Sequence, residues 1–157
     1  MEVLLRILKW SALIVGILVI SLLIILYTVF PKVDPAGDII IESSAEMIAR
    51  GDYLANHVAV CIDCHSTRDW SYFAGPIVPG SEGIGGEEFG KDFGFPGTFY
   101  AKNITPTGIG DWTDGELYRL ITTGVTPDWE PIFPLMPYPS YGKMDVEDMK
   151  SIIAYIR

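Results

Sequence analysis

Cysteine and histidine are scarce in this chain, with two of each among 157 residues. A closed structural zinc site takes four ligands in a tetrahedral arrangement. The chain could therefore build one only from Cys61, Cys64, His57 and His65 together. The side chains of the adjacent Cys64 and His65 point in different directions on a helix, which disfavours such a site. The strand–helix–strand pattern that surrounds a thioredoxin-like cysteine pair is also missing from the sequence.

Positive charge is in short supply as well: 11 Lys and Arg stand against 20 Asp and Glu, a formal net charge of −9. After residue 31 there are nine basic residues and nineteen acidic ones. This excess disfavours nucleic acid as a partner, because phosphate backbones are bound by Lys and Arg. It favours a partner protein with a basic docking patch, since complementary potentials raise association rates. Solubility is the alternative explanation of any single acidic side chain.

The two cysteines stand in the pattern C-x-x-C-H, as Cys61-Ile62-Asp63-Cys64-His65. This is the pattern to which a c-type haem is attached. Two thiols three residues apart on one helical turn can bond to the two vinyl groups of a porphyrin, and the following imidazole can bind its iron. The motif predicts one covalently bound haem c, with His65 as an iron ligand. An inert disulfide in an oxidising compartment is the alternative.

A long apolar run lies near the N-terminus, where the 21 residues from Trp10 to Phe30 carry no charge. About 20 such residues cross a bilayer as a helix. A cleaved signal peptide, the competing interpretation, has a shorter apolar core and a small-residue cleavage site. This run ends instead in Tyr27-Thr28-Val29-Phe30-Pro31, which favours a retained anchor.

The orientation of the anchor follows from Arg6 and Lys9 on its N-terminal flank, because positive charge stays on the cytoplasmic side. The C-terminal part would then emerge on the other face. In a bacterium that is the periplasmic side of the inner membrane, where c-type haem is attached. The prediction is a single-pass inner-membrane protein with a periplasmic haem domain.

Composition divides the chain into four parts. They are a cytoplasmic N-terminus (1–9), a transmembrane anchor (10–30), a linker broken by Pro and Gly (31–42) and a monohaem domain (43–157). The final helical pattern still runs at Arg157, so we expect a few natural residues beyond it.

A first helix of the domain is predicted after Ser43, which would cap it in a box with Glu46. Its apolar stripe comprises Met47, Gly51, Leu54, Val58 and Cys61, and would deliver Cys61 to the haem edge. Gly51 weakens a helix, so we expect another helix to approach closely there. His57 lies eight residues before His65 on the same predicted helix and is interpreted as an ordinary side chain.

No helix is expected from Ser66 to Asp111, where Gly and Pro interrupt almost every window. Thr113 and Glu116 form a second capping box, and Gly124 is placed to end the helix that they begin. Asp145 is predicted to cap the last helix.

A second axial ligand is sought among the methionines, because Met/His ligation is typical of electron-transfer haems. Met136 lies between Pro134 and Pro137, which stiffen the backbone of its loop. A methionine that fills a gap in the core is the alternative. Met144 is the weaker candidate.

Several further motifs resemble those of class I cytochromes c, and more narrowly the haem domains of bacterial alcohol and gluconate dehydrogenase cytochrome subunits. They are Arg50-Gly51-Asp52-Tyr53-Leu54-Ala55, Phe73-Ala74-Gly75-Pro76, Asn103-Ile104-Thr105-Pro106, Gly108-Ile109-Gly110-Asp111-Trp112 and Phe133-Pro134-Leu135-Met136-Pro137-Tyr138-Pro139-Ser140-Tyr141. The resemblance covers about residues 45–157. It differs in one respect: those subunits carry three haem motifs and this chain carries one.

The resemblance implies an all-α fold of three main helices with long haem-wrapping loops. It implies Cys61 and Cys64 as thioether anchors and His65 and Met136 as axial ligands. It also places Asn103, Thr105 and Trp112 near the haem and its propionates.

The expected function is electron transfer rather than catalysis, by a membrane-anchored monohaem cytochrome c of a bacterial respiratory chain. The expected donor is a quinol-oxidising complex or a dehydrogenase, the expected acceptor is a haem–copper oxidase, and the chain could be a subunit of such a complex. One alternative is a haem enzyme or gas sensor with a displaceable distal ligand. Another is a structural subunit whose haem is incidental.

Overall fold

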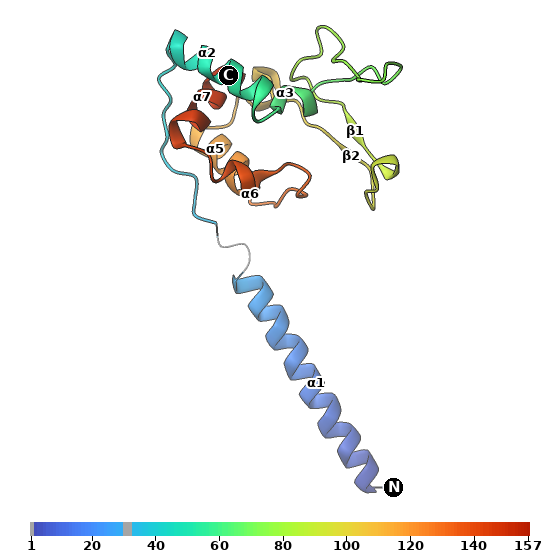
Figure 1. The fold of residues 1–157 in the computed structure, drawn as a ribbon. Coiled ribbons are helices and arrows are strands. Elements are labelled where there is room, and N and C mark those ends of the chain that lie inside the picture. Colours follow the sequence, from blue (N-terminus) through green and yellow to red (C-terminus); the bar gives the residue numbers. More distant parts are fainter. Residues whose placement is uncertain (1, 30–32) are drawn as a thin grey trace. The chain divides into compact units, whose positions relative to one another are not determined.

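The computed structural model describes residues 2–29 and 33–157. The chain forms two compact units, Met1–Asp34 and Pro35–Arg157. The first unit is built on one long helix, and the second combines several helices with long loops and a small two-stranded ribbon (Figure 1). The fold is therefore mostly helical, as predicted.

The first unit consists of helix α1 (Glu2–Val29), whose most apolar window has a mean hydropathy of 2.9 and no buried residue. At 1.5 Å per residue, α1 is roughly 42 Å long and exceeds the roughly 30 Å hydrocarbon core of a bilayer. It is long and apolar enough to span a membrane. The anchor predicted for 10–30 falls within α1 except for Phe30, which lies outside the described residues, and residues 2–9 continue the same helix.

The second unit contains three longer helices, α2 (Ala45–His57), α5 (Asp114–Thr123) and α7 (Val146–Ile156). Shorter pieces are α3 (Cys61–Cys64), the 3-10 turn η1 (Lys91–Phe93), α4 (Pro106–Ile109) and α6 (Tyr138–Tyr141). Strands β1 (Glu88–Phe89) and β2 (Phe99–Tyr100) pair antiparallel, with Glu88 opposite Tyr100. The three longer helices supply most of the core.

Helices α2 and α7 approach each other closely at Gly51. A Cβ placed on Gly51 would lie 1.9 Å from the backbone oxygen of Ser151. On the rim of the same contact, the Arg50 guanidinium donates two hydrogen bonds to Asp148, at 2.9 and 3.1 Å. The close helix approach predicted from Gly51 is confirmed.

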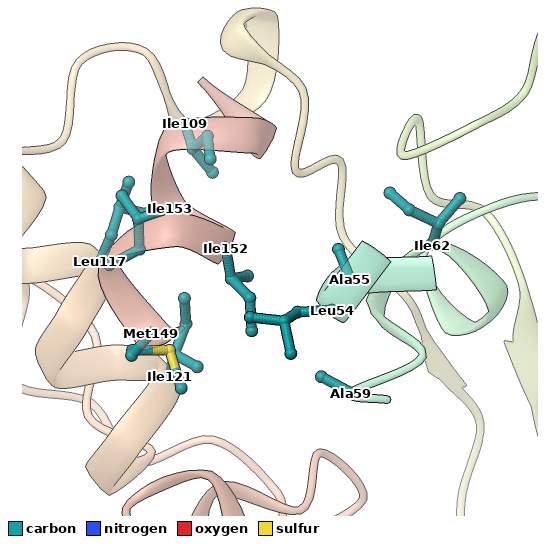
Figure 2. Packing of buried hydrophobic residues seen from close by; sticks show 10 residues of the cluster. All are labelled: Leu54, Ala55, Ala59, Ile62, Ile109, Leu117, Ile121, Met149, Ile152 and Ile153. Carbon is teal, nitrogen blue, oxygen red and sulfur yellow. The ribbon is translucent and has the colours of Figure 1, made fainter. Parts of the chain in front are cut away.

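The hydrophobic core joins these helices to the segment around α3 (Figure 2). Its members are Leu54, Ala55, Ala59, Ile62, Ile109, Leu117, Ile121, Met149, Ile152 and Ile153. Ile62 stands between the two cysteines, so burial of its side chain fixes the rotation of α3 in the core.

The predicted helix ends at α5 and α7 are confirmed. Thr113 and Glu116 form a reciprocal capping box, and Gly124 ends α5 in the left-handed conformation at φ 75°. Asp145 caps α7 by accepting a hydrogen bond from the backbone N–H of Glu147.

The predictions for the first helix of this unit need correction. Its N-cap is Ser44, which accepts from the N–H of Met47, so the box of Ser43 with Glu46 is not formed. The helix ends at His57, and Val60 adopts a left-handed φ of 49° before α3 begins. Cys61 therefore lies on a separate short helix. A continuous apolar stripe was the wrong interpretation, because Val58 is 53% exposed.

The stretch from Ser66 to Asp111 is largely irregular, as predicted, but it contains three elements that the Gly and Pro pattern did not indicate. They are the β1–β2 hairpin, η1 and α4. The two strands of the hairpin, η1 and α4 are each four residues or shorter, too short to produce a hydrophobic period in the sequence.

The linker predicted for 31–42 has no regular structure in its described part, from residue 33 onward, and residues 31 and 32 lie outside the described residues. Its later residues pack on the start of α5. The N–H of Ile41 donates to Asp114 at 2.8 Å, and the Gly37 oxygen lies 1.9 Å from where a Cβ on Gly115 would be.

Substitution of Gly51 by Ala should lower the free energy of unfolding by about 2–4 kcal/mol, because the new methyl group overlaps the α7 backbone. Denaturant unfolding of the second unit measures this. Gly97→Ala is the matched control, since a Cβ there meets nothing within 4 Å. Equal stability of the two variants would contradict the close approach of α2 and α7.

Glu116 should stabilise the fold in a pH-dependent way. Hydrogen bonds from the Thr113 backbone and hydroxyl groups hold the pKa of Glu116 below its ordinary value of 4.5. A carboxylate with a lowered folded-state pKa contributes stability above its unfolded pKa and loses it as pH falls through the folded pKa. Wild type should therefore exceed Glu116→Gln in unfolding free energy at neutral pH, and the difference should shrink below pH 4.5. Glu46→Gln, in the first turn of α2, is the control, and a pH-independent difference for Glu116→Gln would refute the capping role.

Candidate haem site

Helix α3 presents the two cysteines on a single turn. The His65 N–H donates to the Cys61 oxygen at 2.9 Å, which closes that turn. Ile62 is buried between the thiols, Cys61 is half-buried and Cys64 is exposed. Cys61 packs against the edge of the core, whereas Cys64 faces solvent.

The His65 ring is oriented by a backbone carbonyl. Its Nδ1 lies 2.7 Å from the Lys102 oxygen. A carbonyl only accepts, so Nδ1 must carry the proton and Nε2 is left with a free lone pair. Burial lowers the pKa of His65, and the hydrogen bond to Lys102 partly offsets this. A neutral imidazole with a fixed tautomer is the form that binds a metal.

Both thiols are protonated near neutral pH. Burial raises the pKa of Cys61 to about 11. The pKa of Cys64 is raised first by burial and then by the nearby Asp63 carboxylate. Within residues 2–29 and 33–157, three or more His, Cys, Asp or Glu side chains do not gather into a metal-binding group. The described residues therefore give no support to the zinc alternative. His57, one of the four residues that such a site would need, packs with its ring centroid 5.4 Å from that of Tyr53.

The loop that carries Met136 is tied to the segment before Cys61. The Tyr141 hydroxyl, five residues after Met136, donates to the Ala59 oxygen at 2.6 Å. Burial first, and then the nearby Cys61 and Cys64, raise the pKa of Tyr141. Met136 is half-buried and packs against the same hydrophobic core as Cys61. Met144 also packs against this core, so burial does not distinguish the two thioethers. The choice of Met136 rests on the prolines that stiffen its loop.

Asn103 and Thr105 lie next to the carbonyl that orients His65. The Asn103 side-chain oxygen accepts from the Thr105 N–H at 2.8 Å and from the Thr105 hydroxyl at 2.7 Å. The Ile104 N–H between them donates to the Gly83 oxygen at 2.8 Å. These bonds make a rigid support on the His65 side of the site.

Trp112 lies elsewhere, at the junction of α4 and α5. Its backbone N–H donates to the Ile109 oxygen at 3.1 Å, and its backbone carbonyl accepts from the Arg157 guanidinium. The indole is half-buried against the core. The structure therefore groups Asn103 and Thr105 with His65, and Trp112 with the end of α7.

Sequence reasoning missed a polar network behind the cysteines. The buried Glu87 carboxylate accepts from the Trp70 indole N–H at 2.6 Å and from the Arg68 N–H at 3.1 Å. The Arg68 guanidinium donates to the Gly75 oxygen at 2.6 Å and to Asp63 at 3.2 Å. It thereby fixes the loop from 68 to 87 against α3. The one signal in the sequence was Asp63 five residues before Arg68.

The residues present fit a covalently attached haem. Two thiols stand one turn apart, the adjacent imidazole keeps a free nitrogen, and a thioether lies on a loop that is bonded to the same segment. This donor set suits iron in a porphyrin and is too small for a closed zinc site.

Comparison with known proteins agrees with this donor chemistry. The chain is 35% identical over 117 residues to the gluconate 2-dehydrogenase cytochrome c subunit of Pantoea cypripedii, covering 73% of this chain and 23% of that protein. It is 34% identical over 113 residues to the fructose dehydrogenase cytochrome subunit of Gluconobacter japonicus, covering 69% and 20%. A diheme cytochrome c-type protein of Cereibacter sphaeroides is 32% identical over 99 residues, covering 61% and 31%. No family model matches the chain.

The chain is therefore homologous to the cytochrome c subunits of bacterial dehydrogenases, which confirms the resemblance seen in its motifs. It spans between a fifth and a quarter of the length of these two curated relatives. The homology supports haem c as the cofactor and electron transfer, rather than substrate catalysis, as the role.

Proposed function

We propose that the chain is a membrane-anchored cytochrome c that holds one haem and passes single electrons on the periplasmic side of a bacterial inner membrane. Cys61 and Cys64 would hold the porphyrin, and His65 and Met136 would hold its iron. The observation that carries this proposal is the 2.7 Å contact between His65 Nδ1 and the Lys102 oxygen, which reserves Nε2 for a metal. One C-x-x-C-H motif and two cysteines in 157 residues argue for a single haem.

The haem, when bound, supplies a reversible one-electron couple. The residues of this chain tune that couple. Lys102 orients His65, the Arg68–Glu87 network holds the loop behind Cys64, and the Tyr141–Ala59 bond restrains the loop of Met136. A thioether ligand raises the potential, and a restrained ligand keeps the geometry similar in both oxidation states.

The class I cytochrome c fold belongs to the same proposal. Helices α2, α5 and α7 would be its three main helices, and the loops from 66 to 111 and from 125 to 143 would wrap the haem. Residues 43–157 would form the haem domain and 31–42 the linker. Asn103, Thr105 and Trp112 would lie near the haem, the first two on the His65 side.

The proposed membrane topology rests on the apolar run of α1 and on the charges in its first turns. Arg6 and Lys9 would keep the N-terminal end in the cytoplasm, which puts the haem domain in the periplasm. Tethering confines the search for redox partners to the membrane surface and raises their effective concentration.

The proposed donor is a dehydrogenase or a quinol-oxidising complex, and the chain would be its carrier or its subunit. The names of the relatives, which are dehydrogenase cytochrome subunits, support a dehydrogenase. A haem–copper oxidase as acceptor rests on the sequence reasoning alone. The excess of acidic residues favours partners with basic docking surfaces.

The test is electron transfer in native membranes. A tagged chain is purified in mild detergent, the proteins bound to it are identified, and the absorbance of the ferrous haem is followed after adding quinol or the substrate of a bound dehydrogenase. We expect rapid reduction of the haem in the wild-type chain. The chain with both Cys61→Ala and Cys64→Ala, taken from the same membranes, should show no absorbance of ferrous haem. A haem that dithionite reduces, but that neither quinol nor any dehydrogenase substrate reduces, would contradict the proposal.

A further inference from the structure

Three phenylalanines join the β1–β2 hairpin to the loop of Met136. The rings of Phe99, on β2, and Phe133, three residues before Met136, are stacked with centroids 4.3 Å apart and planes 15° apart. Phe95, in the turn of the hairpin, meets both edge-on, at 6.0 Å from Phe99 and 6.1 Å from Phe133. We call Phe95, Phe99 and Phe133 the aromatic clasp. Figure 1 shows the loop before α6 extending toward the hairpin.

The base of the hairpin is anchored next to His65. Immediately after β2, the Ala101 N–H donates to the Glu87 oxygen at 2.9 Å, and Lys102 then orients His65. One short segment, 99–102, therefore contacts the Met136 loop through Phe99 and His65 through Lys102. It bridges His65 and the loop that carries Met136.

The loop of Met136 is anchored on both sides of Phe133, by a backbone bond before it and a side-chain bond after it. The Ile132 N–H donates to the Gly124 oxygen at 2.9 Å, and the Tyr141 hydroxyl bonds to Ala59 at 2.6 Å. Between these anchors stand Phe133, Pro134 and Met136. The prolines limit local rotation, but they do not fix the distance of the loop from the hairpin. The stacking of Phe99 on Phe133 fixes the distance between the loop and the hairpin.

We propose that Phe99 is a positioning residue for the distal ligand: through the aromatic clasp, the β1–β2 hairpin keeps the Met136 thioether on the iron. The inference rests on the proposed function, in which Met136 is that ligand. Loss of an aromatic pair corresponds to roughly a two- to tenfold change in an equilibrium. Without the clasp, the loop spends a larger fraction of time with Met136 off the iron.

The hairpin offers a matched control. Phe93 lies on the same hairpin and packs against Phe89, at 5.8 Å, and Trp70, at 6.3 Å. Phe89 is also the cross-strand partner of Phe99, so this second aromatic group adjoins the clasp without including Phe133. Phe93→Ala removes an aromatic ring of the same size without touching Phe133.

The experiment measures ligand release in the haem-loaded full chain. Carbon monoxide binds ferrous iron only when the distal position opens, so its apparent affinity scales with the open fraction. We expect Phe99→Ala to raise that affinity by roughly tenfold and to weaken the far-red ferric band of the iron–methionine bond. Phe99→Leu, which keeps apolar bulk, should show a smaller change in the same direction, and Phe93→Ala should match wild type.

Two results would overturn the proposal. One is a Phe99→Ala protein with wild-type affinity for carbon monoxide and a wild-type far-red band. The other is an equal change in Phe93→Ala, which would mean general loosening of the hairpin. Met136→Ala, measured alongside, separates the proposals: if it keeps the far-red band, the ligand assignment itself is wrong, whatever Phe99→Ala does.

Discussion

Chains with both Cys61→Ala and Cys64→Ala will migrate on denaturing gels without any haem stain, whereas wild type will stain at its own mass. The thiols stand one turn apart on α3, with Cys61 at the edge of the core and Cys64 exposed. Thioether bonds survive denaturation, but axial bonds to iron do not. Removal of both sulfurs should therefore abolish the signal completely.

Each single cysteine variant refines this prediction. One thioether still holds the porphyrin through denaturation, so Cys61→Ala and Cys64→Ala alone should keep a weakened stain. Met136→Ala serves as the positive control, because it leaves both anchors in place. A stained double variant would show that the haem is held by other residues, and an unstained wild type would restore the disulfide alternative.

Met136→Ala will keep its covalent haem but lower the reduction potential on the order of 100 mV, a modest share of the roughly 0.8 V that axial ligands span. Loss of a thioether removes the ligand that favours ferrous iron. Potentiometric titration of the purified chain measures the shift, and the far-red ferric band should vanish with it.

Met144→Ala is the control for this experiment, since Met144 packs against the same core but lies just before α7. It should leave the potential and the band unchanged. If Met136→Ala has no effect and Met144→Ala lowers the potential, the second ligand is Met144. Met149→Ala is less suitable, because Met149 is 1% exposed and its removal opens a cavity in the core.

The features that sequence predicted well depend on neighbours in the chain. The capping box of Thr113 and Glu116 closes within four residues, and the left-handed Gly124 follows from local backbone preference. Gly51 was predictable for a related reason, because a glycine inside an apolar helix is costly unless another backbone lies against it. The C-x-x-C-H motif is local in the same sense.

Features that depend on distant partners were not predictable. The choice of Ser44 over Ser43 as the cap of α2 is local but was not predictable either, because both have a hydroxyl and composition does not separate them. The break at Val60 places a valine at φ 49°, a conformation that no valine prefers. The Val60 side chain is 40% exposed while Ala59 and Ile62 beside it are buried, and the break separates Cys61 from the helix that was expected to carry it.

The support of the site is likewise non-local. The Lys102 oxygen reaches His65 across 37 residues, and any residue type could supply that backbone oxygen. Phe99 and Phe133 are 34 positions apart, and their pairing is set by a hairpin too short to be read from the sequence. The proposed iron ligands were therefore visible as residue types, while the groups that orient them required the structure.

The central claim is that the iron has two protein ligands and works as an electron relay. The ferric spectrum of the wild-type chain in native membranes, followed by reduction and exposure to carbon monoxide, tests it most directly. The account predicts a far-red iron–methionine band in the ferric state and little carbon monoxide binding in the ferrous state. A ferric spectrum without that band, together with ready carbon monoxide binding, would contradict it and favour a haem enzyme or gas sensor.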